Sequence, residues 1–200
     1  MKRKIWYILL TALFLVLLIL YKFNKLEFID DYFYKIIISI KNDNITNIMK
    51  NITFLASTNF ILLLMLILFI LSIFNYKIPI IINILIIIET IINHLIKIII
   101  RRDRPILINL VEETSFSFPS GHTMVSVILY GFIIYIVNKS KLDKIYKIII
   151  ISLLSLLILL IMISRIYLGV HYFSDVIAGF TLALAILLLA IDIIERKKIL

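Results

Sequence analysis

Residues 164–175 read Ser-Arg-Ile-Tyr-Leu-Gly-Val-His-Tyr-Phe-Ser-Asp and lie between two apolar runs, residues 145–163 and 176–194. Polar and ionisable groups beside a membrane are costly unless they face protein, water or a ligand. His171 and Asp175 are four positions apart, so on a helix they share a face, and the carboxylate can accept a proton from one imidazole nitrogen. The other nitrogen is then free to act as a nucleophile. Arg165 carries a forked guanidinium that suits a phosphate group, so this stretch predicts a phosphate site at a membrane surface.

The composition is that of an integral membrane protein. The 200-residue chain is 63% hydrophobic, and its mean hydropathy of +1.15 is too high for a soluble domain. We expect one integral membrane domain over residues 1–200, because short polar connections alternate with the apolar runs. The absence of cysteine excludes disulfides, thiolate catalysis and cysteine-based metal sites. The net charge of +9 is dispersed, which favours membrane lipids and an anionic substrate as partners over nucleic acid, and no obligate protein partner is indicated.

Six apolar runs approach or reach the roughly 17–25 residues that a helix needs to cross a bilayer. They lie at residues 5–21, 52–74, 79–100, 122–137, 145–163 and 176–194. In the more polar residues 24–50, Ile29, Phe33 and Ile36 recur at helical spacing among charged residues. This pattern predicts an amphipathic helix along the interface, with a partly ordered loop as the alternative. The expected fold class is all-α, a six-transmembrane-helix bundle with an interfacial helical segment between helices 1 and 2.

The distribution of basic residues predicts the orientation in the membrane. If the N-terminus is inside, six spans leave these basic residues inside: Lys2, Arg3, Lys4, Lys77, Lys139, Lys141, Lys144, Lys147, Arg196, Lys197 and Lys198. Only Asp143, Asp192 and Glu195 oppose them, and an excess of lysine and arginine is typical of cytoplasmic segments. We therefore expect a multi-pass protein of the cytoplasmic membrane, with residues 101–122 and 165–175 on its outer face.

Two further basic side chains lie near the middle of the chain. Lys97 and Arg104 are separated by six residues, and with Arg165 they supply positive charge. Phosphoryl transfer spreads negative charge over three equatorial oxygens in the transition state, so three cations of this kind favour a phosphate substrate.

A turn of sequence Pro-Ser-Gly-His at residues 119–122 opens the fourth span. The Ser120 side chain and the first backbone amides of the helix are expected where helix starts bind anions. Gly121 has no Cβ atom and lets the backbone approach a phosphate closely.

Together these segments resemble the signature of the type 2 phosphatidic acid phosphatase (lipid phosphate phosphatase) superfamily, and of its small bacterial members in particular. The matching residues are Lys97-x6-Arg104-Pro105, Pro119-Ser120-Gly121-His122 and Ser164-Arg165-x5-His171-x3-Asp175. The resemblance implies that His171 attacks phosphorus and forms a phosphohistidine, that His122 protonates the leaving oxygen, and that Asp175 orients His171. It also implies phosphate binding by Lys97, Arg104, Ser120, Gly121 and Arg165, with no metal and no cofactor.

The resemblance implies a lipid phosphate or pyrophosphate as substrate. Phosphatidylglycerophosphate and undecaprenyl pyrophosphate are the two leading candidates and phosphatidic acid is the third, with a broad-specificity phosphatidic acid or phosphate ester phosphatase as the alternative. Arg101 and Arg102 are candidates for holding a second phosphate group. Phe173 occupies a position where many relatives have proline, and this affects the stiffness of the loop rather than the reaction.

Two other classes of function are weaker. A vanadate-dependent haloperoxidase shares the oxyanion site, but those enzymes are soluble, so six spans argue against it. The other class is a transporter or channel lined by Glu89, Lys97 and Arg104. Membrane spans broken by proline or glycine would favour this class. Apart from Pro79, however, prolines occur only within residues 101–121. Glu89 and Asn93 are then expected as hydrogen-bonding residues inside the bundle. His94 belongs to no motif and is expected to be a packing residue.

Overall fold

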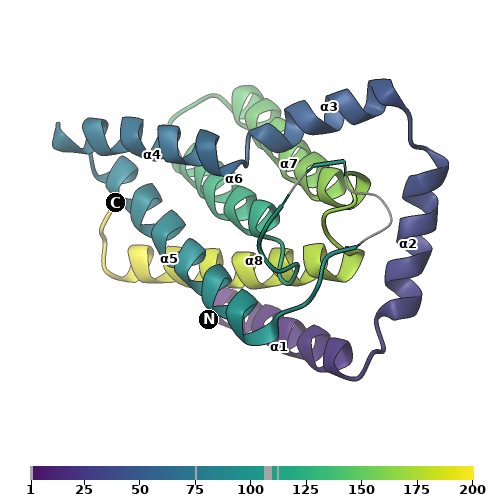
Figure 1. Cartoon of the computed structure of the whole chain (residues 1–200). Helices are drawn as coiled ribbons and strands as arrows, with labels where there is room; N and C mark the ends of the chain where they lie inside the picture. The colour runs from purple at the N-terminus through teal and green to yellow at the C-terminus, as the bar shows by residue number, and fades with distance from the viewer. Residues whose placement is uncertain (1, 75, 106–109, 112) are drawn as a thin grey trace.

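The structure, a computed structural model, describes residues 2–74, 76–105, 110–111 and 113–200. Its helices are α1 (Lys2–Lys22), α2 (Glu27–Ser39), α3 (Asp43–Phe54), α4 (Thr58–Ile73), α5 (Lys77–Ile100), α6 (Gly121–Lys139), α7 (Lys144–Tyr167) and α8 (Phe173–Arg196) (Figure 1). Over these described residues there is no strand, and the predicted all-α class is confirmed.

Six helical stretches are long and apolar enough to cross a membrane. They are Arg3–Lys22, Asp43–Ile73, Lys77–Ile100, Gly121–Lys139, Lys144–Tyr167 and Phe173–Arg196. Five of them have 19–24 residues, which at 1.5 Å per residue gives about 28–36 Å and matches a hydrocarbon core of about 30 Å. Many isoleucine and leucine side chains on α1, α4, α5 and α7 are exposed, which suits contact with lipid. The six predicted spans are confirmed.

The segment between the first two spans is helical, as predicted, but it is divided differently. It contains α2 and then α3, and residues 55–57 separate α3 from α4. α4 has only 16 residues, or about 24 Å, and the stretch that is long and apolar enough to cross a membrane includes α3 and starts at Asp43. The predicted start at residue 52 was wrong because the polar residues of α3 resemble an interfacial pattern. Two of them, Thr46 and Thr53, are instead buried and hydrogen-bonded to side chains of α7.

α6 is the central helix of the bundle. Residues 123–130 are all buried, because α5, α7 and α8 pack around this helix. α8 approaches its start most closely at Gly179, where a Cβ atom would lie only 2.9 Å from the carbonyl oxygen of Ser120. The backbone amide of Ser120 also donates to the carbonyl oxygen of Asp175 at 3.1 Å. The turn that opens α6 is therefore fixed against the first turns of α8.

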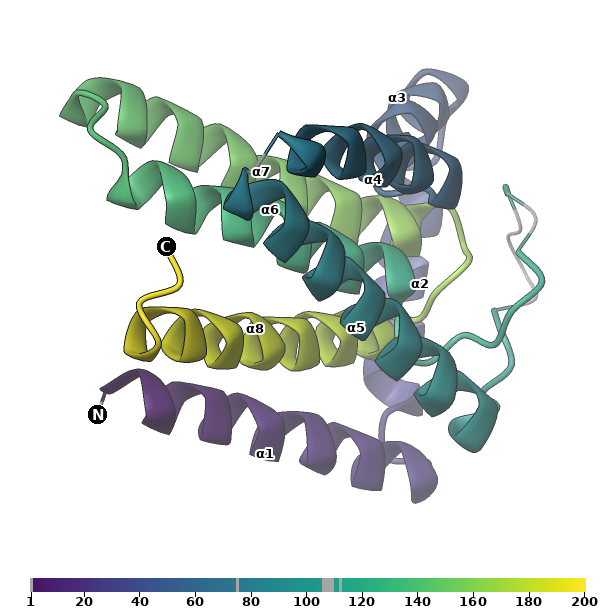
Figure 2. The same ribbon diagram turned by 90° about the vertical axis from the view of Figure 1, so that its left-hand side faces the viewer.

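Both chain ends lie at the same end of the bundle (Figure 2). Glu195 on α8 pairs there with Arg3 at 2.5 Å and with Lys139 at 3.1 Å. Lys77 reaches the same end, where its Nζ donates to the carbonyl oxygen of Ile199 at 3.2 Å. The connections from α5 to α6 and from α7 to α8 lie at the opposite end, so the three motifs gather away from the termini.

Candidate active site

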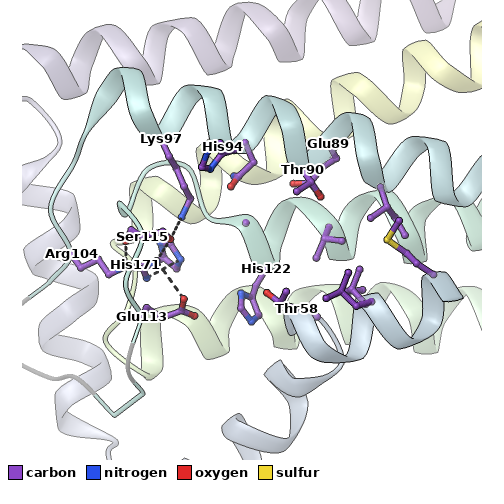
Figure 3. Close-up of a pocket in the computed structure, with 18 residues that line it drawn as sticks. Thr58, Glu89, Thr90, His94, Lys97, Arg104, Glu113, Ser115, His122 and His171 are labelled. Carbon is purple, nitrogen blue, oxygen red and sulfur yellow. Dashed lines mark hydrogen bonds and ion pairs between the residues drawn. The ribbon is translucent and has the colours of Figure 1, made fainter.

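A cavity of about 280 Å³ contains residues of all three motifs. The predicted site residues that line it are Lys97 on α5, Arg104 in the following connection, Gly121 and His122 at the start of α6, and His171 just before α8 (Figure 3). Segments that are far apart in the chain thus contribute to one space, as the motifs predict.

His171 is held by groups on both sides of its ring. Its Nδ1 lies 3.6 Å from Oδ2 of Asp175 and 3.4 Å from the hydroxyl of Ser117, which itself donates to the same carboxylate oxygen. Its Nε2 lies 3.4 Å from Nη1 of Arg104. With Nδ1 protonated on the side of Asp175, Nε2 keeps its lone pair on the side of Arg104.

Burial lowers the pKa of His171 well below its ordinary value, and the positive charges of Arg104, Arg165 and Lys97 lower it further. The ring is therefore uncharged at neutral pH, and only the uncharged ring has a lone pair on Nε2. A neutral imidazole beside several cations is suited to attack an electrophile that those cations bind as an anion.

The pairing of His171 with Asp175 does not arise from one helical face, as the spacing of four suggested. α8 begins at Phe173, so His171 precedes the helix. The chain turns at Gly169, which has a φ of 72°, and Asp175 in the first turn of α8 accepts the backbone amide of Tyr172 at 2.9 Å. The turn and the helix cap together bring the carboxylate to the imidazole.

Lys97 and Arg104 bind the same short stretch of the connection. Nζ of Lys97 donates to the Ser115 hydroxyl at 3.1 Å and to the Phe116 carbonyl oxygen at 2.5 Å. Arg104 donates to the Ser115 carbonyl oxygen and to the Val170 carbonyl oxygen, both at 2.7 Å. These contacts hold both cations beside His171.

Arg165 lines a neighbouring cavity of about 560 Å³ that also contains His122 and Glu113. Its two terminal nitrogens lie 2.5 Å from a carboxylate oxygen of Glu113 and 2.9 Å from the Thr53 hydroxyl. Arg104 approaches the other oxygen of Glu113 at 3.7 Å. The two guanidinium groups thus converge on one carboxylate, a spacing that suits a shared anion.

Ser120 and Gly121 have different surroundings. The hydroxyl of Ser120 is fully buried and caps α6, where it accepts from the Thr123 amide at 3.5 Å and the Thr123 hydroxyl at 3.0 Å. Gly121 lines the cavity, and a Cβ atom there would lie 3.3 Å from Oδ1 of Asn93. The structure brings Gly121 to the cavity but keeps the Ser120 side chain in the helix cap.

The prediction that Arg102 holds a second phosphate was wrong. Its guanidinium is buried and lies 2.6 Å from each of two carboxylates, Asp30 and Asp175. Burial alone would lower the pKa of Arg102, but these carboxylates raise it overall. Arg101 is exposed and donates to the carbonyl oxygen of Ile98, one turn earlier.

The sequence reading missed three polar residues of this site, namely Asp30, Glu113 and Ser117. Asp30 resembled any charged residue of an amphipathic helix. Glu113 and Ser117 lie in a connection rich in polar residues, where no spacing distinguishes them. The only signal for Ser117 was its place next to the motif at residues 119–122.

Comparisons with known proteins agree with this geometry. The family model of the PAP2 superfamily matches residues 78–199. Phosphatidylglycerophosphatase B of Bacillus subtilis (strain 168) is 33% identical over 193 residues, which cover 94% of this chain and 95% of that protein. All three motifs lie within the stretch that the family model matches.

Two solved structures are similar. The crystal structure of the first transmembrane PAP2 type phosphatidylglycerolphosphate phosphatase from Bacillus subtilis superposes with a TM-score of 0.87 at 29% identity, covering 96% of each chain. That of Aquifex aeolicus LpxE gives 0.61 at 23% identity, covering 80% of this chain and 92% of the other, and supports the fold alone. The chain belongs to the PAP2 superfamily and is a membrane phosphatase, as its three motifs predict.

Proposed function

We propose that the protein hydrolyses the phosphate ester of a membrane lipid through a phosphohistidine on His171. The observation that supports this most directly is the buried, neutral imidazole between Asp175 at 3.6 Å and Arg104 at 3.4 Å. An anionic phosphate bound by Arg104 and Lys97 would bring phosphorus to Nε2, the nitrogen that keeps its lone pair.

In the first step, Nε2 of His171 bonds to phosphorus, and the bond between phosphorus and the lipid oxygen breaks. His122 lines both cavities and gives a proton to that oxygen, so the lipid leaves as an alcohol. The imidazole ring then carries a positive charge, which Asp175 stabilises.

In the second step, a water molecule attacks phosphorus as it gives a proton to His122. The bond between phosphorus and Nε2 breaks, and inorganic phosphate leaves. Arg104, Arg165 and Lys97 stabilise the charge on the equatorial oxygens in both steps. These steps use side chains of this chain and water alone.

The lining of the cavity favours a glycerolipid as substrate. Beyond His122, Figure 3 shows Thr58, Glu89 and Thr90 on the side remote from Arg104. The same cavity is lined by apolar residues, among them Leu62, Met65 and Ile86. A glycerol phosphate has hydroxyl or ester oxygens next to its phosphate, whereas a polyprenyl chain would offer no polar partner to the buried Glu89 or to the more exposed Thr58 and Thr90.

Phosphatidylglycerophosphate is therefore the leading candidate, followed by phosphatidic acid, and undecaprenyl pyrophosphate becomes the third. The similarity to the Bacillus phosphatidylglycerophosphatase B supports the first place. Arg102 binds two carboxylates and is not free to bind a second phosphate of a pyrophosphate. The lipid tail adds about 0.8 kcal/mol per buried methylene, so it contributes strongly to recognition.

The test compares four substrates with one purified protein in detergent: the three lipids and a water-soluble phosphate ester. We expect release of inorganic phosphate with EDTA present, fastest from phosphatidylglycerophosphate. His171→Ala protein serves as the blank. Preference for the soluble ester would overturn the lipid assignment, and preference for undecaprenyl pyrophosphate would overturn the glycerolipid order.

We further propose that the site faces the outer side of the cytoplasmic membrane. Arg3, Lys77 and Lys139 all lie at the end of the bundle that holds the termini. Because basic residues favour the cytoplasmic side, this end is expected inside, and the opposite end, which holds the site, is expected to face outward.

Single cysteines test this orientation, because the chain has no cysteine of its own. Thr114 and Lys141 are both exposed, Thr114 near the site and Lys141 between α6 and α7. In intact cells, a membrane-impermeant maleimide is expected to label Thr114→Cys and not Lys141→Cys, with both labelled after permeabilisation. Labelling of Lys141→Cys alone in intact cells would reverse the orientation.

A further inference from the structure

α2 brings a second carboxylate to the partner of His171. Asp30 is only 3% exposed, although its neighbours Ile29 and Asp31 on the same helix are exposed. It accepts hydrogen bonds from the backbone amide and the hydroxyl of Ser174, both at 2.8 Å, and from Nη2 of Arg102 at 2.6 Å. Three donors at these distances are the surroundings of an ionised carboxylate.

Arg102 links Asp30 to Asp175. Its Nη1 lies 2.6 Å from Oδ1 of Asp175, and its guanidinium carbon lies 4.7 Å and 4.1 Å from the ring centres of Tyr21 and Tyr172. The two rings restrict the guanidinium to one orientation. Because Oδ1 is taken by Arg102, the other oxygen of Asp175 remains for the groups around His171.

The net charge of Asp30, Arg102 and Asp175 affects the reaction. If Arg102 were paired with Asp175 alone, its positive charge would cancel the negative charge of Asp175. Such a neutral pair would stabilise a positively charged His171 ring poorly. With Asp30 included, the group carries one net negative charge. Phosphorylation of His171 produces a positive charge, and the whole cluster then becomes neutral.

We propose that Asp30 is a positioning residue of the reaction, which holds Arg102 against Asp175 and preserves the negative charge that the phosphorylated His171 requires. The inference rests on the proposed phosphohistidine mechanism. It makes α2, an element outside the three motifs, a part of the active site. Stacking of Phe33 on Phe173, with ring centres 3.8 Å apart and planes 5° apart, fixes α2 on the start of α8.

Asp30→Asn keeps the shape of the side chain and removes its charge. We expect kcat for the lipid phosphate to fall about 10- to 100-fold, the range for outer groups that orient a functional histidine, with little change in KM. Asp31→Asn, an exposed neighbour on α2, is the matched control and is expected to behave as wild type.

The pH profile separates an effect of charge from general damage. The charged groups that face His171 are Arg104, Asp175, Lys97 and Arg165, with His122 also lining the cavity. Activity falls in acid as His171 takes up a proton, and loss of a nearby negative charge disfavours that proton. The acid limb of kcat/KM is thus expected at lower pH in Asp30→Asn than in wild type. If the substitution instead let water into the site, the pKa of His171 would rise towards its ordinary value, and the acid limb would move to higher pH.

A double variant completes the test. Asp30→Asn removes a negative charge, and adding Arg102→Gln removes a positive charge. The group in the double variant therefore has one net negative charge, on Asp175, as the wild-type group has. We expect the acid limb to return towards the wild-type position and kcat to exceed that of Asp30→Asn. Unchanged kcat in Asp30→Asn, an acid limb at higher pH, or a double variant no faster than Asp30→Asn would each overturn the inference. If His171→Ala is also active, the proposed mechanism itself has failed, whereas an inactive His171→Ala confines the failure to Asp30.

Discussion

His171→Ala is expected to lower kcat for the lipid phosphate by at least about 10⁴-fold, because it removes the atom that bonds to phosphorus. Acid quenching during turnover of a lipid labelled with ³²P in its terminal phosphate is expected to trap radioactive wild-type protein. The alanine variant is expected to trap none. Release of inorganic phosphate measures the loss of turnover in parallel.

His171→Asn serves as the companion variant, since it retains a polar group close to the place of Nδ1, opposite Asp175. It is expected to be as inactive as the alanine variant while its thermal unfolding stays close to wild type. Near-normal turnover, or covalent phosphate in either variant, would rule out His171 as the nucleophile.

His122→Ala is expected to lower kcat about 10²- to 10⁴-fold, the usual contribution of a general acid or base. The loss depends on the leaving group, because only a poor one needs a proton as its bond to phosphorus breaks. A lipid alcohol is a poor leaving group, whereas p-nitrophenolate departs without protonation. With p-nitrophenyl phosphate, we therefore expect the first step of the variant to stay near the wild-type rate.

Because His122 also activates water in the second step, the phosphorylated protein is expected to accumulate in this variant. A burst of p-nitrophenolate equal to the amount of enzyme, followed by slow release, is the expected trace. Equal losses in the first step for the lipid and for the nitrophenyl ester would contradict the assignment of His122 as the acid.

The parts of the site that the sequence predicts are those coded by short, fixed spacings. Lys97 with Arg104, and His171 with Asp175, lie in the same or adjoining elements, so local geometry brings each pair together. Even there the reason differed, because His171 precedes α8 and the pairing depends on a turn and a helix cap. The spacing of residues in the sequence thus predicts which side chains lie close together better than it predicts the backbone conformation that brings them there.

The groups that escaped prediction act across long separations in the chain. Asp30 and Ser174 are 144 positions apart, and Arg165 and Glu113 are 52 apart. Neither pair has a pattern that a local reading can detect. For Arg101 and Arg102, which are adjacent in the chain, the sequence likewise does not predict that their surroundings differ. α5 ends at Ile100, Arg101 caps it with a φ of 52°, and Arg101 is exposed while Arg102 is buried.

The shortness of α4 has a consequence for how a lipid reaches the cavity. At 16 residues, α4 spans about 24 Å, against about 30 Å of hydrocarbon, and the stretch that could cross the membrane therefore also includes α3. Residues 55–57, between these two helices, carry non-helical backbone, and there the Tyr130 hydroxyl donates to the carbonyl oxygen of Leu55 at 2.7 Å while Ala56 lines the catalytic cavity. Non-helical backbone at membrane depth is tolerated where protein covers it or where it lines a cavity. A lipid that diffuses along α4 is therefore expected to reach the cavity at this break between the two helices.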